Sequence, residues 1–122
     1  MKESVIKNKS FNFALSIIDL YKLLISKNEY VLSKQILRSG TSIGANVEEA
    51  SAAQTKKDFA YKMSISSKEA RETLYWLKLI QYSELIPEAN FDKLYVDIEE
   101  LIKILTSIVK TTQTNINSAT KK

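Results

Sequence analysis

The chain has 122 residues, of which 44% are hydrophobic and 26% charged, an ordinary composition for one globular domain. It has no cysteine and no histidine, and only two glycines and one proline. These counts exclude disulfides, thiolate nucleophiles, histidine bases and zinc sites made of Cys and His. So few turn residues favour a small number of long helices over a β-fold.

The formal net charge is +4, from 18 basic and 14 acidic residues, which suits an anionic partner without requiring one. No apolar run reaches the roughly 18 to 20 residues that span a bilayer, and residues 1–9 lack the apolar core of a signal peptide. We therefore expect a cytoplasmic protein that does not enter a membrane.

Apolar residues recur at three- and four-residue spacings in four successive segments, which predicts four helices. We expect the helices at about residues 10–27, 30–53, 56–82 and 87–112. Because short links force neighbouring helices to be antiparallel, residues 1–110 should form one all-α, up-down-up-down four-helix bundle. The polar residues 113–122 are predicted to form a flexible tail.

Several helix starts have recognisable signals in the chain. Asn8 or Ser10 would cap the first helix, and Thr55, with Asp58 three residues later, would cap the third. Pro87 suits the first position of the fourth helix, because its missing N–H is not needed there.

Both glycines, Gly40 and Gly44, fall inside the second predicted helix, one turn apart and therefore on one face. The alternative is a loop at residues 39–42, since each glycine in a helix costs about 1 kcal/mol relative to alanine. Small residues crowd this stretch and would let a neighbouring backbone come close. We therefore favour a continuous helix whose glycines pack against another helix.

The fourth predicted helix has a strict heptad of apolar residues, which is typical of bundle packing: Phe91, Leu94, Ile98, Leu101, Leu105 and Ile108. The third carries a main apolar stripe and a second one, which implies burial on two sides. The surplus suggests contact with another subunit, for which the candidate residues are Tyr61, Ile65, Tyr75, Trp76 and Ile80. Tyr75 and Trp76 could equally be core residues, and large aromatics with a polar edge are more commonly core or interface anchors than base-stacking platforms.

Charge is unevenly distributed along the chain. Residues 55–83 carry six basic and three acidic side chains, whereas residues 84–110 carry three basic and six acidic ones. One interpretation is that these two adjacent helices complement each other. The other is an external basic surface that contacts nucleic-acid phosphates, with the candidates Lys56, Lys57, Lys62, Arg71 and Lys78.

Polar residues at helical spacing form a line on the second helix and another on the third. They predict a partly buried hydrogen-bonded network, whose members are Arg38, Ser42, Asn46, Glu49, Lys68, Glu69 and Glu72. Because a buried charge must be paired, we expect Arg38 to bind Glu69 or Glu72.

The same carboxylates raise the possibility of an enzyme. The pairs Glu48/Glu49 and Glu69/Glu72 could hold a divalent cation through oxygen ligands. No histidine would support such a metal, and Gly40-x-x-x-Gly44 lacks the Lys-Ser/Thr of a phosphate-binding loop. We therefore expect a structural network, no cofactor and no metal.

Two specific elements carry a family resemblance: Arg-Ser-x-x-Ser-Ile-x-x-Asn within residues 38–46, and Lys-Glu-x-x-Glu-x-x-Tyr-Trp within residues 68–76. With them, residues 10–110 resemble the four-helix bundle protein family, which includes proteins encoded within intervening sequences of bacterial large-subunit ribosomal RNA genes. The resemblance implies an antiparallel bundle that assembles into a ring-like homopentamer, and no known enzymatic activity. A related accessory protein of diversity-generating retroelements binds nucleic acid and a reverse transcriptase.

These observations lead to one functional expectation and one alternative. We expect a non-enzymatic, homo-oligomeric binding module that contacts structured RNA or DNA through a basic surface. The alternative is a protein-binding scaffold with no nucleic-acid role. A carboxylate-dependent metalloenzyme is the least favoured reading.

Overall fold

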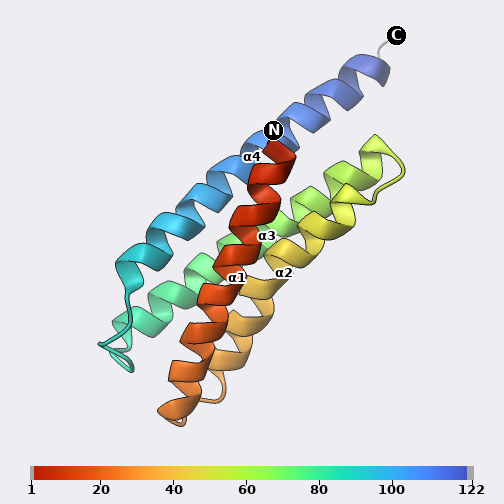
Figure 1. Ribbon diagram of the computed structural model, residues 1–122. Coiled ribbons are helices and arrows are strands. Elements are labelled where there is room, and N and C mark those ends of the chain that lie inside the picture. Colours follow the sequence, from red (N-terminus) through yellow and green to blue (C-terminus); the bar gives the residue numbers. More distant parts are fainter. Residues whose placement is uncertain (1, 121–122) are drawn as a thin grey trace.

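The computed structural model describes residues 2–120, with side chains described for residues 4–118. It contains four helices: α1 (Lys2–Ser26), α2 (Leu32–Ser51), α3 (Lys56–Tyr82) and α4 (Phe91–Thr120). Each helix runs antiparallel to the next and α4 packs against α1, so that α1 and α3 lie at opposite corners (Figure 1). The described residues contain no strand, and the predicted all-α, four-helix arrangement is confirmed.

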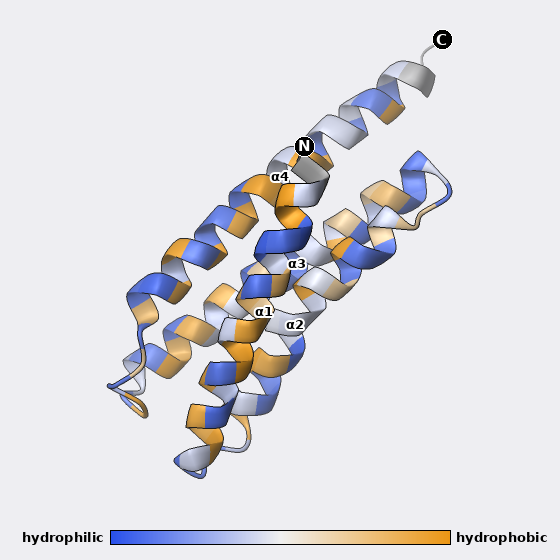
Figure 2. Cartoon of the chain, in the orientation of Figure 1, coloured by the Kyte–Doolittle hydropathy of each residue, from blue (hydrophilic) through white to orange (hydrophobic). Residues whose placement is uncertain are grey.

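The core follows the apolar lines of the helices, and Figure 2 shows apolar bands alternating with polar ones along each of them. On α4 the heptad pattern is confirmed, because all six of its apolar residues are buried. On α3 the main stripe is buried through Met63, Ser66, Ala70 and Leu77. The helices therefore meet through the periodic positions that the chain displays.

The N-terminal start of α1 differs from the prediction. The helix begins at Lys2, well before Asn8 or Ser10, so neither of these residues is its N-cap. Ile6 lies seven residues before Phe13, and both side chains are buried on the same line of the helix. Burying Ile6 requires the backbone there to be helical, which explains the earlier start.

The turn between α1 and α2 is organised by two polar residues. Asn28 has a φ of 62°, a left-handed conformation that asparagine tolerates better than most residues. The Glu29 carboxylate accepts the backbone N–H groups of Val31, Leu32 and Ser33 at 3.2, 3.0 and 2.8 Å. Burial raises the pKa of Glu29, but these hydrogen bonds lower it by more, so its pKa lies below the ordinary value. Glu29 thus caps α2, a role that the spacing of residues did not reveal.

α2 runs without interruption through Gly40 and Gly44, which confirms the continuous helix. A Cβ atom added to Gly40 would lie only 2.8 Å from Cγ1 of Ile17 on α1. One added to Gly44 would lie 3.4 Å from the hydroxyl oxygen of Ser10. Both glycines therefore serve the close approach of α1 and α2, and Gly40 leaves no free space.

The seam between α2 and α3 contains buried hydroxyl groups. Ser66 donates a hydrogen bond of 2.8 Å to the carbonyl oxygen of Ile43. The hydroxyl oxygen of Thr73 lies 2.9 Å from that of Ser39 and 2.7 Å from the carbonyl oxygen of Glu69. Because small hydroxyl residues fit between closely packed helices, these contacts connect α2 and α3 without a bulky side chain.

The predicted start of α3 is confirmed, whereas the predicted start of α4 is wrong. The Thr55 side chain accepts the backbone N–H of Asp58 at 3.0 Å, so the predicted cap of α3 is confirmed. Pro87 does not begin α4; it lies in the turn before the helix. The cap is Asn90, whose side-chain oxygen accepts the backbone N–H of Lys93 at 3.3 Å. Asparagine supplies the acceptor that proline lacks.

α4 continues to Thr120 and projects beyond the ends of the other helices (Figure 1). The prediction that the helix ends near residue 112 is therefore wrong, because residues 113–120 are helical. Residues 121–122 of the predicted tail lie outside the described part of the chain. Between residues 111 and 118 the side chains are mostly exposed, and of these only Thr112 and Ile116 are partly covered. Each residue added to an existing helix gains one backbone hydrogen bond without a new nucleation cost. The helix can therefore continue where no core lies beneath it.

Candidate functional site

Four of the five basic residues predicted to contact phosphates have exposed side chains: Lys56, Lys57, Arg71 and Lys78. The fifth, Lys62, faces α2, where its ammonium nitrogen lies 3.3 Å from a carboxylate oxygen of Glu49. Lys62 therefore belongs to the α2–α3 seam and not to the exposed surface.

Three of these residues form the outer basic row of α3, defined as Lys57, Arg71 and Lys78. They are separated by seven or fourteen residues, so they lie along one line of the helix. The Arg71 guanidinium donates to the hydroxyl of Thr106 on α4 at 3.2 Å and remains exposed. Lys68, predicted to join the polar network, is instead exposed on this side of α3 with no ion-pair partner among residues 4–118.

Two of the three carboxylates of α3, those of Glu69 and Glu72, point towards α2 and are already engaged. One guanidinium nitrogen of Arg38 lies 3.2 Å from a carboxylate oxygen of Glu69, and the other binds Glu72. The predicted pairing of Arg38 is confirmed, with the cation shared by both carboxylates. All three side chains are partly exposed, so solvent screens these ion pairs and their contribution to stability is modest.

No ion pair joins α3 to α4 within the described residues. Two of the four acidic side chains of α4 have other partners: Glu100 lies 2.8 Å from the ammonium group of Lys9 on α1, and Asp97 lies 3.0 Å from that of Lys93 on α4 itself. The opposite charges of the two helices therefore do not compensate each other by direct contact. This leaves the outer basic row without a carboxylate partner among residues 4–118.

The remaining members of the predicted network do not connect to it. The hydroxyl of Ser42 donates to the carbonyl oxygen of Arg38 at 2.6 Å, and the amide of Asn46 donates to that of Ser42 at 2.9 Å. Both bonds stay within α2, because short side chains at four-residue spacing reach the carbonyl of the preceding turn first. Of the predicted members, only Arg38, Glu69 and Glu72 form a connected interhelical network, which Trp76 joins by a hydrogen bond to Glu72.

Each of the four carboxylates considered for a metal ion has a basic partner. Glu48 pairs with Lys7 at 3.7 Å and Glu49 with Lys62, while Arg38 takes the other two. Within residues 4–118, no three or more acidic side chains gather where they could hold a metal ion. The arrangement of these carboxylates is that of interhelical ion pairs.

The residues predicted for a subunit contact divide into three kinds. Ile80 is fully buried in the core, so its assignment to an outer contact is wrong. It lies three residues after Leu77 and joins the same inward-facing stripe. Ile65 and Trp76 are half-buried, and only Tyr61 and Tyr75 are exposed enough for a second molecule to reach.

Tyr75 is held by a chain of contacts that begins at the ion pairs. Its ring meets that of Trp76 edge to face, with 5.2 Å between centroids and 67° between planes. The indole N–H of Trp76 donates to a carboxylate oxygen of Glu72 at 3.3 Å, and Glu72 is bound by Arg38. The orientation of the exposed Tyr75 ring is therefore supported from beneath.

A third exposed tyrosine escaped the sequence interpretation. Tyr61, Tyr75 and Tyr82 are 64%, 56% and 81% exposed, and we call them the tyrosine row of α3. They are fourteen and seven residues apart, so they also follow one line of the helix. Their seven-residue spacing was the signal that could have identified Tyr82.

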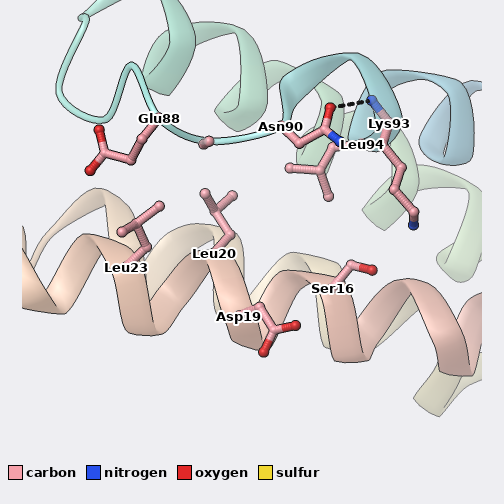
Figure 3. A pocket seen from close by; sticks show the side chains of 9 residues that line it. Ser16, Asp19, Leu20, Leu23, Glu88, Asn90, Lys93 and Leu94 are labelled. Atoms are coloured by element: carbon pink, nitrogen blue, oxygen red, sulfur yellow. Dashed lines mark hydrogen bonds between the residues drawn. The ribbon is translucent and has the colours of Figure 1, made fainter.

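A separate open hollow of about 370 Å³ lies between α1 and the start of α4 (Figure 3). Leu20, Leu23 and Leu94 form its apolar part, and Asp19 and Glu88 lie at its polar side. None of the residues predicted to bind a partner lines this hollow.

No helix within the described residues is long and apolar enough to cross a membrane. No curated protein matches the chain. A similar solved structure is that of a protein with unknown function from the S23 ribosomal protein family of Bacteroides thetaiotaomicron VPI-5482. It is 50% identical, with a TM-score of 0.86 and coverage of 90% of this chain and 99% of that one. The family model for 23S rRNA-intervening sequence proteins matches residues 2–107. Because this match covers most of the chain, the protein belongs to the 23S rRNA-intervening sequence protein family.

Proposed function

We propose that this protein is a cytoplasmic, non-enzymatic and oligomeric module that binds structured RNA or DNA through the outer surface of α3. The carrying observation is that no carboxylate among residues 4–118 forms an ion pair with the outer basic row. Glu69 and Glu72 of α3 bind Arg38 instead, and the ion pairs of α4 are formed with other lysines. Exposed cations that are aligned along a helix and form no ion pair with another part of the described chain are suited to a row of phosphates.

The proposal predicts a specific dependence on salt. Phosphate contacts release counterions, so the affinity should fall as salt rises, and each lysine that contacts a phosphate contributes about one unit to the slope of log K against log salt concentration. We expect Lys57→Ala combined with Lys78→Ala to reduce that slope by about two and to weaken binding roughly tenfold or more near physiological salt. Fluorescence anisotropy with a labelled fragment of 23S rRNA measures both quantities.

A matched control separates a local effect from loss of net charge. Lys22→Ala combined with Lys34→Ala removes the same charge from exposed lysines on α1 and α2, neither of which forms an ion pair with residues 4–118. This control should bind as the unmodified protein does. Absence of salt-sensitive binding, or an equal loss in the control, would contradict the proposed function.

We propose that the protein is a homopentamer, as the family resemblance implies. We further propose that the subunits contact each other through α1. Phe11 and Leu15 are 64% and 49% exposed on α1, four residues apart on the same side of the helix. α1 lies at the opposite corner of the bundle from α3. In a cyclic pentamer each contact joins two different faces, so we propose that the α1 patch meets another face of the neighbouring subunit and that the outer surface of α3 stays accessible.

Light scattering tests this assembly. We expect a mass near five times the 13.9 kDa of one chain, and smaller species when Phe11 and Leu15 are both replaced by serine. Val96→Ser is the control, since Val96 is 67% exposed on α4. If Trp76→Ala dissociates the assembly and the α1 variant does not, the subunits meet through α3. The scaffold function is favoured instead if the unmodified protein is a monomer that binds another protein through the exposed side chains of Phe11 and Leu15.

A further inference from the structure

We propose that the α3 surface recognises single-stranded nucleic acid whose bases stack on the tyrosine row while the phosphates contact the outer basic row. This inference rests on the proposed function and specifies its substrate: unpaired loops or strands rather than a continuous duplex. It gives a role to three aromatic side chains that no other part of the described chain covers.

The two rows are in register with each other. Each tyrosine lies four residues after a basic residue: Tyr61 after Lys57, Tyr75 after Arg71, and Tyr82 after Lys78. Side chains four residues apart on a helix are neighbours, with about 5 to 6 Å between their Cβ atoms. α3 thus repeats one unit three times, and each unit pairs a cation for a phosphate with a ring for a base.

The position between Tyr61 and Tyr75 continues the pattern. It is occupied by Lys68, seven residues from each of them, so the line reads ring, ammonium group, ring, ring along the helix. Lys68 is exposed and has no ion-pair partner among residues 4–118. A strand following this line would meet positive charge or an aromatic face every two turns, which is about 10.5 Å.

Of the three tyrosine rings, that of Tyr75 is the one whose orientation is held by neighbouring side chains. The edge contact with Trp76, the hydrogen bond from Trp76 to Glu72 and the ion pair with Arg38 hold its surroundings in one arrangement. When a base stacks on Tyr75, the tyrosine therefore loses less side-chain freedom than an unsupported ring would. Tyr75 should therefore contribute most of the stacking.

The tyrosines distinguish a single strand from a duplex. Base faces are hidden inside a double helix, so a protein surface that reads duplex RNA relies on phosphate and 2′-hydroxyl contacts. Unpaired bases expose their faces, and stacking on an aromatic side chain strengthens binding without a sequence preference. A surface meant for phosphates alone would not need three exposed rings aligned with its cations.

The experiment compares labelled oligouridine with the same strand annealed to oligoadenosine, by fluorescence anisotropy on the full chain. We expect tighter binding of the single strand. Replacing Tyr61, Tyr75 and Tyr82 together by leucine should weaken single-strand binding at least about 100-fold while leaving the salt slope unchanged. Tyr30→Leu is the matched control, because Tyr30 is an exposed tyrosine outside α3.

Trp76 supplies a second readout because it is the only tryptophan in the chain and touches Tyr75. Stacking of a base on Tyr75 should change the fluorescence of Trp76, and Tyr75→Leu should remove that change. This signal reports the local contact independently of affinity.

The outcomes separate this inference from the proposed function. Equal binding of single strand and duplex, with the tyrosine variant unaffected and the Lys57/Lys78 variant impaired, would overturn base stacking and leave phosphate binding intact. No salt-sensitive binding of either probe would overturn both. A tyrosine variant with a lower mass in light scattering would show that the row is a subunit contact, which also overturns the inference.

Discussion

Gly40→Val is expected to lower the free energy of unfolding by about 2 to 3 kcal/mol, a large share of the stability of a small domain. A Cβ atom at this position would approach three carbon atoms of Ile17, at 2.8, 2.9 and 3.2 Å. The branched carbons of Ile17 lie in the core between α1 and α2, so they cannot swing aside as the end of a long side chain could. Valine would add further methyl groups and force the helices apart.

Gly44→Ala is the matched control for this prediction. Its added Cβ atom would make an ordinary contact of 3.4 Å with the Ser10 hydroxyl oxygen, and alanine favours helix over glycine by about 1 kcal/mol. We expect unchanged or slightly increased stability. Chemical denaturation followed by circular dichroism measures both variants, and an equal loss at the two positions would contradict the close packing at Gly40.

Ile6→Ala is expected to cost about 2 to 4 kcal/mol, the range for truncating a buried aliphatic side chain. Ile6 is fully buried although it lies near the N-terminus of α1, in a segment with no apolar run. Its loss would leave a cavity beneath the first turns of the helix. The same denaturation experiment measures the effect.

Val5→Ala tests whether that effect comes from burial. Val5 is the neighbouring residue and is 41% exposed, so its truncation should change stability by about 0.5 kcal/mol or less. If Ile6→Ala were as mild as Val5→Ala, the N-terminal turns would not contribute to the core.

The sequence predicted which long periodic segments are helices, but it predicted the first and last residues of those helices less well. The heptad of α4 and the unbroken course of α2 through its glycines follow from spacings within one helix. Helix ends depend on what lies alongside. Ile6 extends α1 because a core is present to receive it, and Asn90 caps α4 in place of Pro87 because the turn positions its side chain.

The candidate site divides in the same way. The pairing of Arg38 with Glu69 and Glu72 could be predicted, because a cation and two carboxylates on adjacent helices have few other partners. The assignments of Lys62 and Lys68 were reversed in the structure. Both are lysines of one helix, and only the rotation of α3 about its axis decides which one faces Glu49 and which one faces solvent.

The amino-acid sequence alone determined the class of fold, the four helices, the packing role of the glycines and the family resemblance. All of these are local or periodic properties, so they can be found in residue spacings. Tertiary structure decided which side chains are free. The outer basic row and the tyrosine row are defined by what α2 and α4 do not cover. Each of these helices hides one side of α3, and α2 also pairs with the charges it meets there.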